Sequence, residues 1–175
     1  MSLTVLVGGA RSGKSGLALR LAVRSGEPVV FVATGEARDD EMSERIDRHR
    51  AERPADWTTV EEPLDLAGAI GSAPDGACVV VDCLSLWVAN LLEHHEADAI
   101  VTVAANAAAL AARRDSPTIA VTNEVGLGLV PTTPLGRAYR DLLGTVNAAW
   151  VAASADAFFV VAGRALRLDS LDAGL

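Results

Sequence analysis

A glycine-rich segment near the N-terminus constrains this chain most strongly, because residues 8–15 fit the pattern G-x-x-x-x-G-K-[S/T]. The mostly apolar run Leu3–Val7 before it is typical of a buried strand, and the apolar residues between Leu17 and Ala22 recur at helical spacing. A strand, a glycine loop and a helix in this order bind phosphate through backbone N–H groups and the helix N-terminus. The segment therefore predicts a nucleoside triphosphate site, with Lys14 at the β- and γ-phosphates and the Ser15 hydroxyl on Mg²⁺.

The rest of the chain alternates short apolar runs with amphipathic or Ala-rich stretches, the pattern of a mostly parallel sheet covered by helices. Further strands are predicted at 28–33, 57–61, 77–82, 118–122 and 156–162, with a short C-terminal edge strand at 164–168. Helices are predicted at 39–53, 64–71, 84–92, 98–114 and 135–153, the last with Leu135, Tyr139, Leu142, Val146 and Ala149 on one apolar face. The length of 175 residues, without repeats or linkers, predicts a single α/β domain over residues 1–175.

Charge and cysteine usage narrow the classes of partner. The formal net charge of −8 argues against a nucleic-acid surface. No apolar run approaches the roughly 18–20 residues of a membrane span, and the chain enters its first strand without a signal peptide. Cys78 and Cys83 flank one apolar strand with no third ligand nearby, which favours buried free thiols over a metal site or a disulfide. We therefore expect a cytoplasmic protein that acts on small molecules.

Several polar segments follow predicted strands directly. Asp82 closes the apolar run ACVVVD, where an enzyme of this class places the acid that organises its metal, although a turn or a helix cap is the alternative. Ala33–Gly35 and Thr122–Glu124 also come directly after strands. Because ligands of open parallel sheets bind outside the carboxyl ends of the strands, we expect these segments to meet the glycine loop in one site.

The helix predicted at 39–53 carries an unusual stripe. At about 100° per residue, one face holds Met42, Arg45, Ile46, His49 and Arg53, with Arg50 on its flank. Guanidinium groups suit phosphate oxygens, and a neutral imidazole can act as a nucleophile or a base. A solvated face, with Arg side chains paired to Glu44, Asp47 and Glu52, explains the spacing equally well.

Two other segments indicate what the chain is not. His94 and His95 lie in an acidic turn, where ordinary surface histidines are expected rather than a metal site. The segment 123–126 reads NEVG and lacks the N-K-x-D pattern by which regulatory GTPases bind guanine. A switch GTPase is therefore not expected, although guanine binding by another route stays open.

The chain resembles the bifunctional adenosylcobinamide kinase/adenosylcobinamide-phosphate guanylyltransferase family of cobalamin biosynthesis nearly from end to end. The resemblance rests on GGARSGKS at 8–15, ATGEARDDEM at 33–42, RIDRHRAERPADWTTVEEP at 45–63, DCLSLWVANLL at 82–92, VTNEVGLGLVP at 121–131, LGRAYRDLLGTVN at 135–147 and VVAG at 160–163. Phosphate-binding loops are widespread, but HRAERPADW and TNEVGLGLVP are much more specific. The stretch at 93–98 is short for the family and touches no motif.

The resemblance implies a three-layer, RecA-like P-loop fold, two reactions at one site, and a homotrimer. ATP or GTP phosphorylates adenosylcobinamide, and GTP then guanylylates a histidine that passes GMP to adenosylcobinamide phosphate. The family's histidine falls on His49, so that His49 and Lys14 are the implied catalytic residues, and Ser15 and Asp82 the implied Mg²⁺ ligands. The implied nucleotide contacts are Gly8, Gly9, Ala10, Arg11, Ser12, Gly13, Lys14, Ser15, Ala33, Thr34, Gly35, Arg50, Ala51, Glu52, Arg53, Glu61 and Asp82. A P-loop small-molecule kinase without guanylyl transfer is the main alternative, and a nucleotide-binding regulatory subunit is a third.

Overall fold

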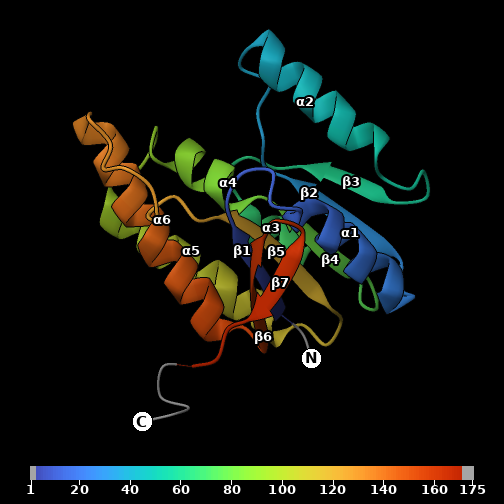
Figure 1. Cartoon of the computed structure of the whole chain (residues 1–175). Coiled ribbons are helices and arrows are strands. Elements are labelled where there is room, and N and C mark those ends of the chain that lie inside the picture. The colour runs from blue at the N-terminus through green and yellow to red at the C-terminus, as the bar shows by residue number, and fades with distance from the viewer. Residues whose placement is uncertain (1–2, 171–175) are drawn as a thin grey trace.

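One sheet of seven strands runs through the molecule, which we describe from a computed structural model over residues 3–170, apart from the side chain of Arg45. The strand order is β3-β2-β4-β5-β1-β6-β7 (Figure 1). All neighbours are parallel except β6 and β7, whose pairing is antiparallel. The strands are β1 (Leu3–Gly8), β2 (Val29–Ala33), β3 (Thr58–Glu61), β4 (Cys78–Asp82), β5 (Thr118–Asn123), β6 (Asp156–Val161) and β7 (Arg164–Arg167). Each predicted strand is thus confirmed, including the C-terminal edge strand.

The helices begin and end at residues with clear local causes. They are α1 (Lys14–Ser25), α2 (Asp40–Ala51), α3 (Leu66–Gly71), α4 (Leu84–Leu91), α5 (Ala97–Arg113) and α6 (Pro134–Ala153). The side chain of Asp39 caps α2 by accepting a 2.7 Å hydrogen bond from the Met42 N–H, and Gly26 ends α1 with φ of 72°. No helix within residues 3–170 is long and apolar enough to cross a bilayer.

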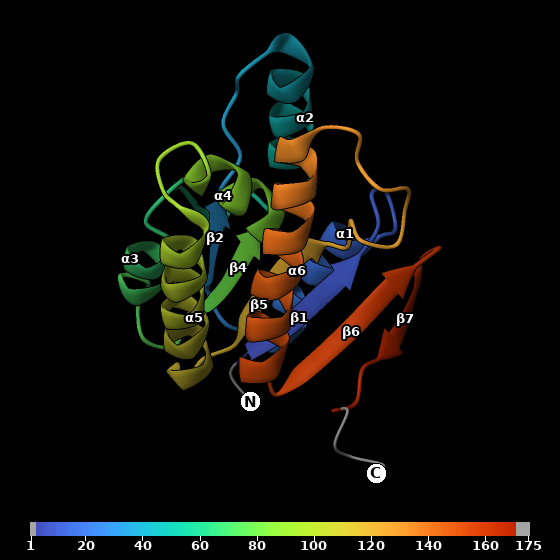
Figure 2. The ribbon, with the colours of Figure 1, turned by 90° about the vertical axis from the view of Figure 1, so that its left-hand side faces the viewer.

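Two apolar layers of unequal size cover the sheet. Alternate residues of the central strands point to opposite faces, so that Val5, Val32 and Val81 join one buried cluster and Leu6, Phe31 and Val80 join another. The helices α3, α4, α5 and α6 lie on the first face, and α1 lies on the second (Figure 2). This arrangement is the predicted three-layer α/β fold.

The first turn of α6 departs from its predicted face. Leu142 and Val146 are buried as expected, but Leu135 is 70% exposed because the helix begins beyond the packed part of the sheet. Leu127, Leu129 and Val130 in the preceding connection are also 66–96% exposed. The β5–α6 connection therefore presents large apolar side chains to solvent.

Strand register brings the ends of five strands to one edge. Ala33 is aligned with both Asp82 and Glu61, and Gly8 is aligned with Asn123. The α2 helix stands above this edge, away from the helices that cover the two faces (Figures 1 and 2). The fold thereby places the polar strand ends, the glycine loop and α2 around one space.

Candidate functional site

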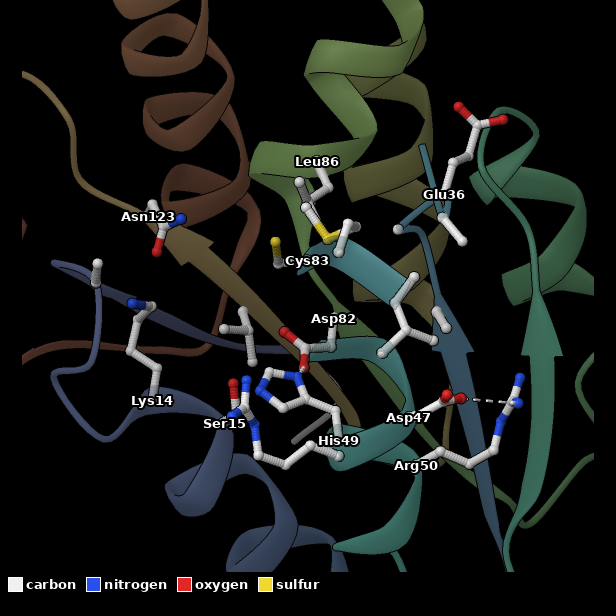
Figure 3. Close-up of a pocket in the computed structure, with 18 of the residues that line it drawn as sticks. Lys14, Ser15, Glu36, Asp47, His49, Arg50, Asp82, Cys83, Leu86 and Asn123 are labelled. Atoms are coloured by element: carbon white, nitrogen blue, oxygen red, sulfur yellow. Dashed lines mark ion pairs between the residues drawn. The ribbon is translucent and has the colours of Figure 1, made fainter. Parts of the chain in front are cut away.

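A cleft of about 1150 Å³ occupies the carboxyl edge of the sheet. The glycine loop, the β2–α2 connection, the inner side of α2 and the ends of β3, β4 and β5 line it (Figure 3). Asp82 comes from the sheet, Lys14 and Ser15 from the glycine loop and the start of α1, and His49 from α2. Side chains from separate parts of the sequence thus share a single cleft, as predicted from the strand ends.

The backbone of the glycine loop depends on its glycines. A Cβ atom at Gly8 would lie 2.2 Å from the Val160 carbonyl oxygen, so that β1 and β6 could not pair as they do with any larger residue. Gly13, which precedes α1, has φ of 104°, a left-handed conformation that side chains disfavour. The buried Lys14 points into the loop, and its Nζ donates a 2.6 Å hydrogen bond to the Gly9 carbonyl.

Asp82 is the side chain on which the charged groups of the cleft converge. Burial raises its pKa, whereas the nearby charges of His49 and Arg53, a hydrogen bond from Ser15 and the charge of Lys14 act in the opposite direction. The side chain is only 14% exposed. A carboxyl that is costly to ionise alone is therefore surrounded by groups that favour its anionic form.

His49 faces Asp82 from the last turns of α2. Its Nδ1 lies 4.0 Å from Asp82 Oδ2, and its side chain is 32% exposed within the cleft. In Figure 3 the imidazole lies beside Asp82 and Ser15. With Nδ1 directed to the carboxylate, Nε2 is the ring nitrogen left for a ligand. Met42, Ile46 and Arg53 also line the cleft, so that the predicted stripe of α2 does face it.

Arg50 of α2 and Arg53, which follows the helix because α2 ends at Ala51 and not at residue 53, tie this region to the sheet. Arg50 forms an ion pair with Glu61 at the end of β3 and lies 3.8 Å from Asp47, so the pairing expected of a solvated helix face is present as well. The Arg53 guanidinium stacks 3.7 Å above the Phe31 ring, and its Nη1 donates to Thr59. Burial lowers the pKa of Arg53, and the charge of Asp82 opposes that shift. Its Nε is buried with no hydrogen-bond partner among the described residues.

The oxygen donors of the cleft fit a small hard cation. Asp82 and Ser15 are the only two protein groups that this site needs to supply, because Mg²⁺ is usually held by one or two protein oxygens, substrate phosphates and water. Within residues 3–170 no group of three or more His, Cys, Asp and Glu side chains is arranged to hold a metal. Both side chains line the cleft, where Ser15 at the start of α1 is one of the groups that lower the pKa of Asp82.

Not every residue assigned from the sequence lines the cleft. Most do, including Ala10–Ser15, Ala33, Gly35, Arg50, Arg53, Glu61 and Asp82. Thr34 is fully buried, and its hydroxyl donates to the Cys83 carbonyl at 2.8 Å and accepts from the Cys83 N–H at 2.9 Å. Ala51 and Glu52 are exposed at the end of α2 and lie outside the cleft lining. The buried Gly8 and the exposed Gly9 do not line the cleft either. Their nucleotide contacts stay predictions.

Three further lining residues make contacts that the sequence did not specify. Asn123 ends β5 beside the glycine loop, and its amide donates a 3.1 Å hydrogen bond to the Ser85 hydroxyl. Asn123 belongs to Thr122–Glu124, the segment that the sequence predicted at this site, whereas Thr122 and Glu124 do not line the cleft. Leu86 and Ile46 close the cleft around Gly35, where an added Cβ would lie 3.2 Å from Leu86 Cδ1. Ile46 belongs to the predicted stripe of α2, whereas nothing in the sequence distinguishes Leu86 from the residues of the core.

Comparisons with known proteins point to one family. A family model described as cobinamide kinase / cobinamide phosphate guanyltransferase matches residues 4–168. The bifunctional adenosylcobalamin biosynthesis protein CobP of Pseudomonas aeruginosa is 44% identical over 160 residues, which cover 91% of this chain and 92% of that protein. The CobU proteins of Escherichia coli and Salmonella typhimurium are 34% and 35% identical, each covering 95% of this chain and 99% of the relative.

Solved structures confirm the predicted RecA-like P-loop fold. The RadB recombinase superposes with a TM-score of 0.51 at 17% identity, covering 90% of this chain and 73% of that one. The flagellar accessory protein FlaH of Methanocaldococcus jannaschii gives a TM-score of 0.51 at 16% identity, with coverage of 95% and 77%. At such low identity these likenesses concern the fold alone.

Proposed function

This chain belongs to the cobinamide kinase / cobinamide phosphate guanyltransferase family, and from that premise we propose how a single cleft carries out both reactions. The protein is a bifunctional enzyme of cobalamin biosynthesis that phosphorylates adenosylcobinamide and then transfers a guanylyl group to the phosphate. The glycine loop binds ATP or GTP in the first reaction and GTP in the second.

In the kinase reaction the hydroxyl oxygen of adenosylcobinamide attacks the γ-phosphorus. A new P–O bond forms, the bond to the β-phosphate oxygen breaks, and the hydroxyl proton leaves to solvent while the nucleoside diphosphate departs. Lys14 neutralises charge on the β- and γ-phosphates, and backbone N–H groups of the loop hold the triphosphate in line. Bound between Ser15 and Asp82, Mg²⁺ would supply further neutralisation of the phosphate oxygens.

In the guanylyl transfer His49 is the nucleophile. Its Nε2 lone pair attacks the α-phosphorus of GTP, a P–N bond forms, and the bond to the β-phosphate breaks to release pyrophosphate. The proton stays on Nδ1, where the Asp82 carboxylate stabilises the positive charge that the ring acquires. The 4.0 Å separation has to shorten by about 1 Å to make a hydrogen bond. A phosphate oxygen of the acceptor then attacks the same phosphorus, and neutral His49 leaves.

The acceptor is large for one 175-residue chain, and we infer a homotrimer in which neighbouring subunits help to bind it. The exposed apolar side chains of the β5–α6 connection support this proposal, because contiguous exposed apolar groups are typical of contact surfaces. The buried thiols of Cys78 and Cys83, both free, support a reducing compartment such as the cytoplasm.

A single observation carries the proposal: the imidazole of His49 lies against Asp82 in the cleft that also contains Lys14. The test is incubation with α-³²P-GTP and Mg²⁺, followed by denaturing electrophoresis. We expect a covalent label that is labile in acid and stable in alkali, as a phosphoramidate is, and that His49→Ala abolishes.

His95→Ala is the matched control, since it removes an exposed imidazole from the turn after α4. It should leave the label at the wild-type level. Persistence of the label in His49→Ala would overturn the assignment of the nucleophile. A wild-type protein that transfers the γ-phosphate but never acquires label would overturn the guanylylated-histidine route as a whole.

A further inference from the structure

The α2 helix is held to the body by few contacts. Among its described side chains none is buried, so apolar packing contributes little to its position. At its two ends α2 is joined to the sheet by the β2–α2 connection (34–39) and by residues 52–57, which lead into β3. The position of His49 is therefore decided largely by how firmly these two segments are fixed to the sheet.

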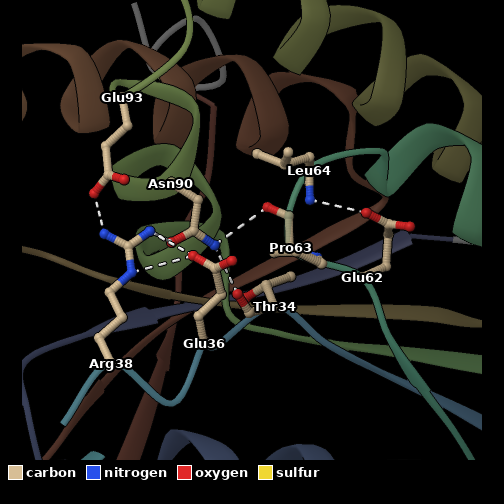
Figure 4. Close-up of polar contacts among 8 residues, drawn as sticks. All are labelled: Thr34, Glu36, Arg38, Glu62, Pro63, Leu64, Asn90 and Glu93. Carbon is tan, nitrogen blue, oxygen red and sulfur yellow. Dashed lines mark hydrogen bonds and ion pairs between the residues drawn. The ribbon is translucent and has the colours of Figure 1, made fainter.

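A buried amide on α4 contacts the first of these segments and the backbone that follows β3. Asn90 is 4% exposed, and its Nδ2 donates to the Thr34 carbonyl at 2.8 Å and to the Pro63 carbonyl at 3.2 Å (Figure 4). Thr34 begins the connection to α2, and Pro63 follows β3, whose last residue is paired with Arg50 of α2. One side chain thus joins the start of the connection that leads into α2 to the backbone just after β3, the strand with which Arg50 of α2 forms its ion pair.

Arg38 extends this anchor to the residue just before the helix cap. Its Nη2 donates a 3.1 Å hydrogen bond to Asn90 Oδ1, and its guanidinium forms ion pairs with Glu36 and with Glu93 at the end of α4. A single exposed ion pair contributes little to stability. The planar guanidinium of Arg38, however, contacts three partners at once, one of which is buried. None of Arg38, Asn90 and Glu93 lines the cleft.

We propose that Arg38, Asn90 and Glu93, which we call the Asn90 anchor, are positioning residues that fix α2 for guanylyl transfer to His49. The proposal rests on His49 being the guanylylated residue. The kinase reaction draws on Lys14, Ser15 and Asp82, none of which belongs to α2. Loosening the anchor should therefore slow the attack of His49 while leaving γ-phosphoryl transfer unchanged.

The test compares two rates in Arg38→Gln and Glu93→Gln. One is the single-turnover rate of label incorporation from α-³²P-GTP, and the other is the steady-state transfer of γ-phosphate from ATP to adenosylcobinamide. We expect labelling to slow by about three- to tenfold, since small misplacements of reacting groups carry costs of this order or more. The kinase kcat and KM should stay at wild-type values, and Arg38→Lys should recover part of the labelling rate.

Arg167→Gln is the control, because it breaks an ion pair with Asp156 on the far β6–β7 edge. Asn90 itself is left intact, since its loss would leave one buried and one partly buried carbonyl without this donor and lower stability generally. Wild-type labelling rates in both anchor variants would overturn the proposal, and so would a parallel fall in kinase activity. Absence of a His49-dependent label from the wild-type protein would instead defeat the proposed function on which the anchor depends.

Discussion

At the scale of single residues, Asp82 combines requirements that conflict. Ionised, it can bind a cation with Ser15 and stabilise a charged His49, but burial raises its pKa and makes the ionised form costly. Asp82 occupies a buried position where a neutral side chain would cost less to bury. Activity and stability are therefore expected to change in opposite directions when the carboxyl is neutralised.

Asp82→Asn tests this conflict on the nucleotide-free protein. Because the folded-state pKa is raised, the folded protein binds more protons than the unfolded chain between the usual and the raised value, and stability falls as pH rises through that window. At neutral pH we expect Asn to raise Tm by about 2–4 °C, the change that about 1 kcal/mol produces in a chain of this size.

Scanning calorimetry across pH would check the effect, with both activities assayed in parallel. The Tm gain should disappear below the ordinary Asp range, where the wild-type carboxyl is also neutral in both states. Labelling and kinase activity should fall by at least about a hundredfold. An unchanged or lower Tm at neutral pH would mean that its positive neighbours fully offset the burial of Asp82.

At the scale of elements, the sequence allowed each helix and strand to be predicted within a few residues. Continuous apolar runs such as that in β4, and helix-start residues such as Asp39, depend on neighbouring residues in the sequence, so they can be predicted without knowing the tertiary fold. The stripe on α2 predicted which side chains face the cleft. It did not predict that Arg53 stacks on Phe31 or that Asn90 holds the connection to α2, because those contacts join residues 22 and 56 positions apart. Strand order is nonlocal for the same reason.

The stacking of Arg53 on Phe31 anchors the end of α2, and Phe31→Leu removes it while keeping an apolar side chain. We expect guanylylation to slow about fivefold, the equivalent of about 1 kcal/mol for a partly buried cation–π contact. Phe158→Leu alters a ring of the same apolar cluster over which no cation lies among the described residues, and it is the control. Equal effects of the two variants on labelling rate would point to core packing and not to the arginine.

At the scale of the whole molecule, the helices are distributed unequally over the two faces of the sheet, and one edge strand is left exposed. Four helices cover one face and one helix the other, while β7 is exposed along its length. The β5–α6 connection exposes Leu127, Leu129 and Val130 together. An isolated chain would leave this apolar surface in water, which is the physical basis for expecting an assembly.

The oligomer prediction concerns this surface. In size-exclusion chromatography with light scattering, the mass of the wild-type protein should be three times its 18.1 kDa chain mass. The double variant Leu127→Asp/Leu129→Asp should shift toward one chain mass. Val23→Asp alters a residue that is 60% exposed on α1 and serves as the control. A wild-type monomer, or a trimer indifferent to the double substitution, would show that the connection is not the contact surface.

The single glycine loop has a consequence for timing. A chain with one place for a triphosphate cannot run the two proposed reactions at once, so every corrinoid that passes through must wait for one nucleotide to be exchanged for the next. The turnover of the pair is then bounded by the sum of the two dwell times, and a compound that occupies the loop stops both. Any gain in speed has to come from faster exchange of nucleotide, since the donors of both reactions enter through the same loop.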